Sequence, residues 1–505
     1  MRDFGVGAWP ARVARQRPHA QAFLYRDHFT TFAEVAERTA RIASVLRAHG
    51  IGRGDRVAYL GHNSALFAEV LFATARLGAV IVPLNTRLAP RETAYILGDC
   101  TPSLLVWAPP FGGIVQDPQV AALGIPTIEV GDDPFTGPLA TLIAQASPDP
   151  IDEPIDHDDL FMIQYTSGTS GHPKGVMMSH GNVTWNVLHA ILDVDLRIGT
   201  VSLVAAPMFH TASLNMHFLP TFLKGGLSII EESWRDERVL DLIEEHRVTY
   251  LSGVTAVYES LTRSPRWPTA DLSSVTVAMS GGSPLPESLL MTYAARGIAI
   301  AQAYGLTESS PGVVILRPQD AVRKLGSAGS PHTFVDLRIV RPDLTPVDTG
   351  EVGEVLVQGP NVTKGYWHNE PATRAAFVDG IWLRTGDLAR MDEDGFLTIV
   401  DRLKDMIISG GENIYPAEVE GVIVSHPAVI EAAVIGVPDP RWGEVGRAVI
   451  AVAPGARVTE DELLGFLDGK IARYKIPKSV IVVEALPHNA AGKLLKRQVK
   501  DEFGN

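Results

Sequence analysis

The chain has 505 residues, of which 46% are hydrophobic and 20% are charged, a composition typical of a globular protein large enough for more than one domain. Its formal net charge is −14 and no basic block interrupts the sequence, which argues against nucleic acid as a partner. The single cysteine, Cys100, excludes an internal disulfide and a cysteine-cluster metal site, and it indicates a reducing compartment such as the cytoplasm.

Two segments bear on targeting. Residues 1–7 lack the charged start and the apolar run of a signal peptide. The most apolar segment, residues 66–84, is interrupted by Glu69, Arg76 and Pro83. Because a membrane-spanning helix needs about 20 predominantly apolar residues, we expect no transmembrane segment.

Helical and strand patterns alternate through the first 150 residues. Residues 32–49 place apolar side chains on one helical stripe, and Gly50 ends the predicted helix. The next predicted elements are a strand over 57–60, a helix over 64–77 that begins at Asn63 or Ser64, and a strand over 79–82. This βαβ alternation predicts a parallel sheet layered by helices.

A short apolar run at residues 160–164 predicts a buried strand, and a loop of small and hydroxyl residues follows it. The loop, residues 165–176, reads Tyr-Thr-Ser-Gly-Thr-Ser-Gly-His-Pro-Lys-Gly-Val. Its glycines permit close approaches, its hydroxyls can donate hydrogen bonds, and Lys174 adds a positive charge, so it can surround a polyphosphate. It is not the common P-loop, because no Gly-Lys-Ser/Thr ends it. Taken alone, it could equally be a surface turn.

The loop resembles the phosphate loop of the adenylate-forming enzymes, which include acyl-CoA synthetases, amino-acid adenylation domains and luciferases. It matches the pattern Thr-Ser-Gly-Thr-x-Gly-x-Pro-Lys-Gly, with Ser170 where the family often has threonine. Further motifs follow in the family's order over nearly the whole chain, and the resemblance is closest to bacterial fatty-acyl-CoA synthetases. It implies a catalytic Lys174 and an ATP-binding loop made of Thr166, Ser167, Gly168, Thr169, Ser170 and Gly171.

The middle third repeats the alternation of strands and helices. We predict strands over 201–206, 227–230 and 250–254, a helix over 236–246, and proline-rich surface connections over 264–268 and 311–319. Residues 336–366 suggest antiparallel strands. The resemblance implies an α/β fold with a large N-terminal domain, residues 1–400, made of layered α/β subdomains and a β-barrel-like part. A small mobile α+β domain, residues 401–505, follows a hinge at Asp401.

Two motifs resemble the family's nucleotide and metal segments. The first is Gln302-Ala-Tyr-Gly-Leu-Thr-Glu308. The resemblance implies that Tyr304 stacks on the adenine ring, that Thr307 contacts the α-phosphate and that Glu308 binds a Mg²⁺ ion. Gly282 and Ser283 belong to a Ser-Gly-Gly-Ser-Pro turn that resembles the turn along the nucleotide. Without the resemblance, both segments would be ordinary solvated turns.

Four motifs of the last quarter complete the resemblance. Asp387 and Arg402 match the family's contacts to the ribose hydroxyls. A carboxylate suits two hydroxyl donors because it only accepts hydrogen bonds. Lys493 matches the catalytic lysine of the C-terminal domain, and Gly411 matches the loop that lines the pantetheine channel. Rotation about Asp401 would remove Lys493 from the active site after acyl-adenylate formation and bring Gly411 to the pantetheine channel for the second reaction. Taken singly, these residues are more often surface residues.

The resemblance also implies a pocket for the acyl group of the substrate. Its candidate lining residues are Phe209, His210, Gly281 and Ala303. An amino-acid adenylation domain would place an aspartate at His210, so amino-acid substrates are disfavoured. No arginine falls within residues 208–219 to pair with a second carboxylate, which disfavours dicarboxylates. Acetate-specific relatives close the pocket with tryptophan where this chain has Gly305, so we expect a larger acid.

These features predict an ATP-dependent ligase that joins a medium-chain, long-chain or bulky acid to coenzyme A through an acyl-adenylate, as in fatty acid metabolism. ATP, Mg²⁺ and coenzyme A are the implied ligands, and we expect a monomer or homodimer. Three alternatives stay open: a ligase that loads a carrier protein, an enzyme that runs only one half-reaction, and a nucleotide-binding regulatory protein.

Overall fold

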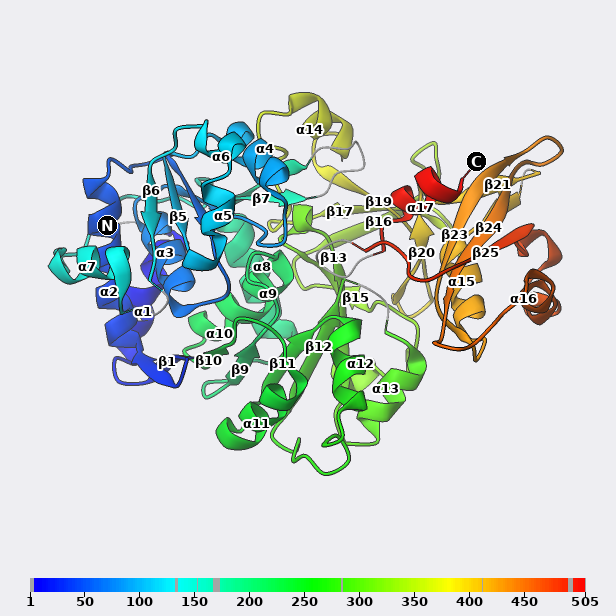
Figure 1. Ribbon diagram of the computed structural model, residues 1–505, viewed down its shortest axis with the longest axis horizontal. Helices are drawn as coiled ribbons and strands as arrows, with labels where there is room; N and C mark the ends of the chain where they lie inside the picture. The colour runs from blue at the N-terminus through cyan, green and yellow to red at the C-terminus, as the bar shows by residue number, and fades with distance from the viewer. Residues whose placement is uncertain are drawn as a thin grey trace. The chain divides into compact units, whose positions relative to one another are not determined.

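The computed structural model describes residues 4–131, 135–151, 153–166, 173–282, 285–410, 412–488 and 494–504. The chain divides into two compact units. Unit 1 comprises Met1–Asp336 and Val357–Leu383, and unit 2 comprises Leu337–Leu356 and Arg384–Asn505. Both units mix helices and strands (Figure 1).

Unit 1 contains two large, mostly parallel sheets. The six-stranded sheet has the order β6-β5-β3-β4-β7-β8 and consists of β3 (Arg56–Leu60), β4 (Val80–Pro83), β5 (Leu104–Trp107), β6 (Thr127–Glu129), β7 (Leu160–Thr166) and β8 (Lys174–Ser179). The nine-stranded sheet has the order β15-β14-β13-β12-β11-β9-β10-β1-β2. Its strands are β1 (Gln21–Tyr25), β2 (His28–Thr31), β9 (Val201–Val204), β10 (Leu227–Ile230), β11 (Tyr250–Gly253), β12 (Val277–Gly281), β13 (Ile300–Gly305), β14 (Gly312–Leu316) and β15 (Ser330–Pro331).

Helices cover both faces of each sheet. The helices of unit 1 are α1 (Trp9–Gln16), α2 (Phe32–Ala48), α3 (Ala65–Arg76), α4 (Pro90–Cys100), α5 (Gly112–Val115), α6 (Pro118–Ala121), α7 (Gly137–Gln145), α8 (His180–Asp193), α9 (Thr211–Ser213), α10 (Leu219–Leu223), α11 (Asp236–His246), α12 (Thr255–Arg263), α13 (Glu287–Ala294) and α14 (Glu370–Ala376). Short 3-10 or π turns are η1 (Val6–Ala8), η2 (Pro109–Phe111), η3 (Leu214–Phe218), η4 (Thr307–Ser309) and η5 (Pro318–Asp320).

The layering follows from the two-residue period of the strands. In β3, Val57 and Tyr59 pack into the central core, while Ala58 and Leu60 pack on the opposite face with α4. In β9, Val204 joins the central core and Leu203 joins the core beneath α11, α12 and α13. Helix α3 lies in the central core, where all of its residues from Ala65 to Ala75 are buried. Unit 1 is therefore a helix–sheet–helix–sheet–helix stack (Figure 1).

A five-stranded sheet has the order β16-β17-β19-β18, with β20 paired to β19. Its strands are β16 (Asp336–Val340), β17 (Gly353–Gln358), β18 (Phe377–Val378), β19 (Trp382–Met391) and β20 (Leu397–Arg402). Strand β19 runs antiparallel to both β18 and β20. Strands β16 and β17 lie within residues 336–366, where strands were expected, whereas β18, β19 and β20 lie beyond that range.

The rest of unit 2 is an α+β structure, as expected. Its sheet consists of β21 (Ile407–Ser409), β22 (Glu412–Ile414), β23 (Val429–Asp439), β24 (Gly443–Val452) and β25 (Ser479–Val483). Its helices are α15 (Pro416–Val424), α16 (Glu460–Leu467) and α17 (Lys496–Phe503), with the short turn η6 (Arg473–Lys475). Alternate residues of β23 pack into two cores, with Val434 toward α15 and Ile435 toward α17.

Most of the predicted elements are present, and one is wrong. The helix expected over 236–246 is α11, and Gly50, which has a positive φ of 82°, follows α2. Residues 311–319 were expected to form a surface connection, but residues 312–316 form the buried strand β14. Pro311 lies just before this strand, where a missing N–H does not interrupt the ladder, so the apolar run after it decides the structure.

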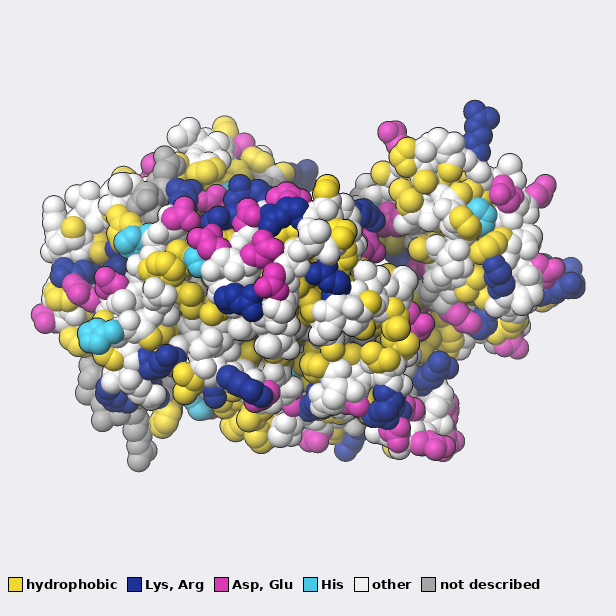
Figure 2. Space-filling model, turned by 90° about the horizontal axis from the view of Figure 1, so that it is seen from below, with side chains coloured by type: hydrophobic (Ala, Val, Ile, Leu, Met, Phe, Trp, Pro, Cys, Tyr) yellow, Lys and Arg dark blue, Asp and Glu magenta, His cyan; other side chains and the backbone are white. Residues whose placement is uncertain are grey.

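The surface shown in Figure 2 mixes acidic and basic side chains, with hydrophobic side chains between them. Ion pairs of the described residues include the exposed pair of Arg247 with Asp271 and the half-buried pair of Arg266 with Glu244. None of the helices in the described ranges is long and apolar enough to cross a membrane.

Candidate active site

The strands β7 and β8 form a hairpin that carries the two ends of the candidate phosphate loop. Thr166 and Lys174 face each other at the end of the hairpin from which the loop leaves. The loop residues Ser167, Gly168, Thr169, Ser170 and Gly171 lie outside the described residues. Gly175 is required for packing, because a Cβ atom there would lie 2.7 Å from Ile163 Cγ2. The buried strand β7 therefore fixes where the loop begins and ends.

Glu308 meets a residue that the sequence analysis did not identify. The hydroxyl of Tyr366 donates a hydrogen bond of 2.8 Å to Glu308 Oε1, and Lys174 Nζ lies 5.0 Å from the centre of the Tyr366 ring. Burial, followed by the neighbouring Glu308 carboxylate, raises the pKa of the Tyr366 hydroxyl, so it stays a donor. No local signal at residue 366 could have revealed a contact 58 residues away in sequence.

The carboxyl ends of β12 and β13 bring together candidates for the acyl side, Gly281 and Ala303, and for the nucleotide side, Gly282 and Tyr304. Gly281 and Ala303 are opposite each other in this parallel pair, and Tyr304 follows Ala303. A Cβ atom on Gly281 would lie 3.0 Å from Ala303 O. Gly282 follows with φ of 85°, and Ser283 lies outside the described residues. Ligands of open α/β sheets bind beyond the carboxyl ends of the strands, which is where these residues lie.

The turn after β13 holds Thr307 and Glu308 in place. Gly305 packs so closely that a Cβ atom there would lie 1.6 Å from Pro311 O. Thr307 and Glu308 follow in η4, where both are half-buried, and the backbone N–H of Thr363 donates to Glu308 O at 2.7 Å. The glycine in this motif is therefore required by backbone packing.

Phe209 and His210 lie in the segment between β9 and α9, with ring centres 4.5 Å apart. Gln164 of β7 donates a side-chain hydrogen bond to Phe209 O, so this segment is tied to the strand before the phosphate loop. Burial, followed by the charge of Arg87, lowers the pKa of His210 to about 4. Its Nε2 is buried without a hydrogen-bond partner among the described residues. His210 is therefore a neutral ring near pH 7.

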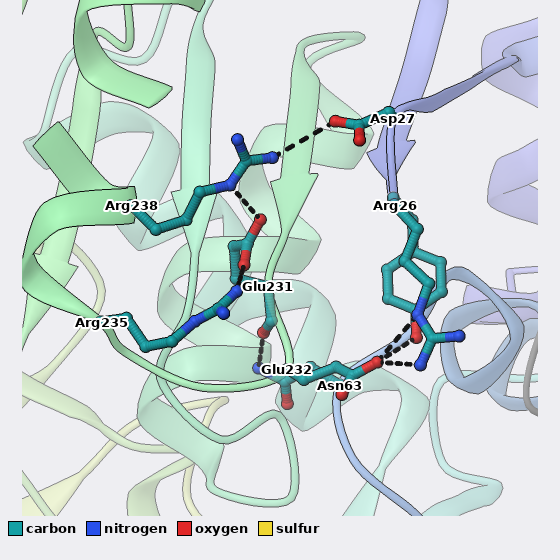
Figure 3. Close-up of polar contacts among 8 residues, drawn as sticks. Arg26, Asp27, Asn63, Glu231, Glu232, Arg235 and Arg238 are labelled. Carbon is teal, nitrogen blue, oxygen red and sulfur yellow. Dashed lines mark hydrogen bonds and ion pairs between the residues drawn. The ribbon is translucent and has the colours of Figure 1, made fainter. Parts of the chain in front are cut away.

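Asn63 fixes the same segment from the other side. Its amide nitrogen donates to Ala206 O at 2.9 Å and to Glu231 O at 3.1 Å, and its oxygen accepts from Met208 N at 2.7 Å. Figure 3 shows Asn63 beside Glu231, whose carboxylate is paired with Arg235 and Arg238. The sequence left Asn63 or Ser64 as the helix cap. Ser64 is the cap, since its hydroxyl accepts from Phe67 N, and the role of Asn63 was missed.

In unit 2, Asp387 and Arg402 are opposite each other on β19 and β20. Arg402 Nε lies 2.9 Å from Asp387 Oδ1, and the side chains are 40% and 5% exposed respectively. A buried carboxylate held by a guanidinium is a fixed acceptor for hydroxyl groups. Gly411 and Lys493 lie outside the described residues.

Asp401, the expected hinge, joins β20 to the start of α15. Its carboxylate accepts hydrogen bonds from Arg402 N at 2.7 Å and from Ala417 N at 2.8 Å. Burial raises the pKa of Asp401, and the nearby Lys496 ammonium opposes this shift. Unit 2 includes residues before 401, and the hinge at Asp401 stays a prediction.

A groove of unit 1 lies apart from these residues. It has a volume of about 760 Å³ and lies beside α14, lined by Phe334, Asp336, Lys364, Arg374 and Phe377 among others. Among the residues that the structure describes, the lining includes none of the sequence-predicted site residues. Phe209 instead borders a narrow crevice with His62, Asn63 and Leu84.

Comparison with known proteins gives a consistent result over the full chain. The AMP-binding enzyme family matches residues 10–367, and the AMP-binding enzyme C-terminal domain matches residues 418–493. A feruloyl-CoA synthase from Amycolatopsis sp is 46% identical over 504 residues, 100% of both chains. A long-chain-fatty-acid–CoA ligase of Mycobacterium tuberculosis is 39% identical, over 97% of this chain and 98% of its own. The solved o-succinylbenzoate coenzyme A synthetase of Bacillus subtilis, in complex with ATP and magnesium ion, has a TM-score of 0.88 and 35% identity, covering 98% of this chain and 99% of that chain.

Proposed function

The chain belongs to the family of AMP-binding enzymes, and on this premise we propose that it is an ATP-dependent carboxylic acid–CoA ligase. It converts an acid and ATP into an acyl-adenylate and pyrophosphate, and then transfers the acyl group to coenzyme A with release of AMP. The observation that carries the proposal is the 46% identity with a feruloyl-CoA synthase over the full length of both chains.

In the first half-reaction an oxygen of the substrate carboxylate attacks the α-phosphorus of ATP, and the bond from that phosphorus to pyrophosphate breaks. Both reactants are negative, so positive groups must offset their repulsion. Lys174 is half-buried and makes no hydrogen bond or ion pair with the described residues, which suits a contact to phosphate. We assign the second positive charge to Lys493.

The residues present fit a magnesium ion at Glu308. Within the described part of the chain, no three acidic, histidine or cysteine side chains gather to hold a metal on their own. Mg²⁺ usually takes one or two carboxylates and completes its shell with phosphate oxygens and water. Glu308 Oε1 accepts the Tyr366 hydrogen bond, and no described residue donates to Oε2. When bound, the ion would neutralise charge on the phosphates.

The other nucleotide contacts follow from chemistry. We propose that the loop of Thr166, Ser167, Gly168, Thr169, Ser170 and Gly171 binds the phosphates together with Thr307. Tyr304 offers its ring to adenine, Gly282 and Ser283 lie along the nucleotide, and Asp387 accepts the ribose hydroxyls with Arg402 beside it.

In the second half-reaction the thiol sulfur attacks the acyl carbon, and the bond from that carbon to the AMP oxygen breaks. We propose that rotation of residues 401–505 about Asp401 removes Lys493 and brings Gly411 to the pantetheine. Cys100 is buried, and burial raises the pKa of its thiol to about 12, so it is a poor nucleophile. The thiol of the reaction therefore comes from the acceptor, which we propose is coenzyme A.

We propose a bulky or medium- to long-chain acid, including aryl acids, as the substrate. The four candidate wall residues, Phe209, His210, Gly281 and Ala303, carry no charge near pH 7, since His210 is neutral there. Such a wall favours an uncharged acyl group, and the small Gly281 and Ala303 leave room for a wide one. We further propose a monomer or homodimer that works in the cytoplasm, where ATP and coenzyme A are available.

The function is tested by acid-dependent exchange of pyrophosphate into ATP over a panel of fatty and ring-substituted cinnamic acids. We expect exchange with at least one such acid, and AMP release with thioester formation on adding coenzyme A. Parallel assays with a phosphopantetheine carrier protein identify the acceptor. No exchange with any acid, alongside thioester formation from a supplied acyl-adenylate, would show that adenylation is lost.

Replacing Asp387 with asparagine is expected to raise the KM for ATP about tenfold with a smaller change in kcat. The reason is that a charged hydrogen-bond acceptor contributes about 1.5 kcal/mol more than a weak neutral one. Steady-state kinetics with ATP varied would measure it. Asp379→Asn is the matched control, because Asp379 is exposed and its φ of 52° suits asparagine. An unchanged KM in Asp387→Asn would remove Asp387 from the ribose site.

A further inference from the structure

One tyrosine side chain in unit 1 contacts two residues of opposite charge that we place in the active site. The Tyr366 hydroxyl donates to Glu308 Oε1 at 2.8 Å, and the Tyr366 ring centre lies 5.0 Å from Lys174 Nζ. Lys174 begins β8, Glu308 lies in η4, and Tyr366 belongs to neither element. A single residue thus contacts both the proposed phosphate-binding cation and the proposed metal ligand.

Tyr366 is itself held by backbone contacts on both sides. It forms an isolated antiparallel bridge with Val176, and the next residue, Trp367, donates its N–H to Gly175 O at 2.7 Å. The backbone N–H of Tyr366 donates to Thr373 Oγ1 at 2.9 Å. Gly365 has φ of 128°, and a Cβ atom there would lie 2.4 Å from Thr373. The position of the phenol ring is therefore fixed by β8 and α14.

The contacts keep Lys174 and Glu308 from neutralising each other. Oppositely charged side chains in one site gain Coulomb energy by pairing, and a direct pair would occupy both. Here the ammonium contacts the ring and the carboxylate contacts the hydroxyl, and the two form no ion pair with one another. The hydroxyl takes one lone-pair direction of Oε1, while Oε2 accepts nothing from the described residues. Both charged groups thus keep free capacity for a ligand.

We propose that Tyr366 is a positioning residue that orients Glu308 toward the magnesium ion and Lys174 toward the phosphates of ATP. The role rests on the proposed function, because it needs MgATP in this site. It adds to that function a residue that orients others without reacting. The hydroxyl acts on Glu308 and the ring acts on Lys174, so the two parts can be removed separately.

The test uses Tyr366→Phe, which removes the hydroxyl and keeps the ring. We expect the Mg²⁺ concentration at which its effect on ATP binding is half-maximal to rise about tenfold. This is the usual scale for one hydrogen bond to a charged group. ATP binding without Mg²⁺ should stay at the wild-type level. Isothermal titration of the full-length protein with ATP at several Mg²⁺ concentrations measures both without relying on turnover. Tyr474→Phe, at an exposed tyrosine, is the matched control.

A double-mutant cycle separates this role from a general loss of structure. In a Glu308→Gln background, Tyr366→Phe should no longer change the Mg²⁺ dependence, because the group it orients is gone. A further substitution, Tyr366→Leu, removes the ring and should also weaken ATP binding without Mg²⁺. Equal Mg²⁺ dependence in wild type and Tyr366→Phe, or an equal effect in both backgrounds, would overturn the inference alone. A wild-type protein that binds no MgATP would overturn the proposed function.

Discussion

Replacing Lys493 with alanine is expected to slow acyl-adenylate formation about 100-fold or more while ATP still binds. The attacking carboxylate and the α-phosphate are both negative, and negative charge spreads over the phosphoryl oxygens at the transition state. A preorganised ammonium that bridges the two offsets this charge more in the transition state than in the bound ground state. Its loss should therefore lower kcat much more than it raises the KM for ATP.

The measurement is pyrophosphate exchange with the best acid of the panel, beside calorimetric ATP binding. Lys500→Ala is the control, because Lys500 is an exposed lysine of α17 seven residues further on. Retained ATP binding with lost adenylation would also exclude a nucleotide-binding regulatory protein without catalysis. Adenylation at the wild-type rate in Lys493→Ala would show that the C-terminal lysine has another task.

The layers of the fold were predictable because they follow from local periodicity. Residues 32–48 and 236–246 place apolar side chains on one helical stripe. Short apolar runs such as 160–164 are too short for a helix and are typical of buried strands. The strand over 312–316 was missed, because the prolines on either side of it, at 311 and 318, suggested a connection. Burial of Val313 to Leu316 against neighbouring strands outweighed that local signal.

The candidate site was predictable only where a residue belongs to a recognisable motif. Glu308, Asp387 and Lys174 became candidates in this way. Asn63 and Tyr366 were not, because their roles arise from contacts over long stretches of sequence, from residue 63 to 206 and from 308 to 366. An asparagine before a helix is a common N-cap. The local pattern of Asn63 therefore indicated a cap and gave no sign of its hydrogen bonds to a distant segment. Such contacts exist only once the sheets are stacked.

The free energy of unfolding is expected to fall steeply as the pH drops from 7.5 to 5.5. Burial lowers the pKa of four histidines from the ordinary 6.5 to about 3 or 4: His180, His189, His210 and His217. The folded protein keeps these rings neutral, whereas the unfolded chain protonates them below about pH 6.5. Lowering the pH therefore favours the unfolded state, and stability is lost through this window.

The size of the effect follows from proton linkage. Each histidine contributes about 1.4 kcal/mol per pH unit once its unfolded form is mostly protonated, so four contribute on the order of 5 kcal/mol between pH 7.5 and 5.5. That is comparable with the total stability of many proteins, roughly 5–15 kcal/mol. Burial raises the pKa of the carboxyls of Glu69, Asp401 and Glu420, which gain protons more readily when folded. Their contribution has the opposite sign and offsets part of the loss at the acid end.

A single substitution isolates one histidine from these opposing groups. His217 packs edge-on against Tyr250, with ring centres 4.4 Å apart, and phenylalanine can keep this contact. Urea unfolding between pH 7.5 and 5.5 should give His217→Phe a smaller slope of unfolding free energy against pH, so that it loses about 1.4 kcal/mol less than the wild type over this range. His19→Gln, at an exposed histidine, should leave the slope unchanged. Equal slopes for His217→Phe and wild type would mean that this ring takes up its proton over the same pH range in the folded protein as in the unfolded chain, contrary to its burial.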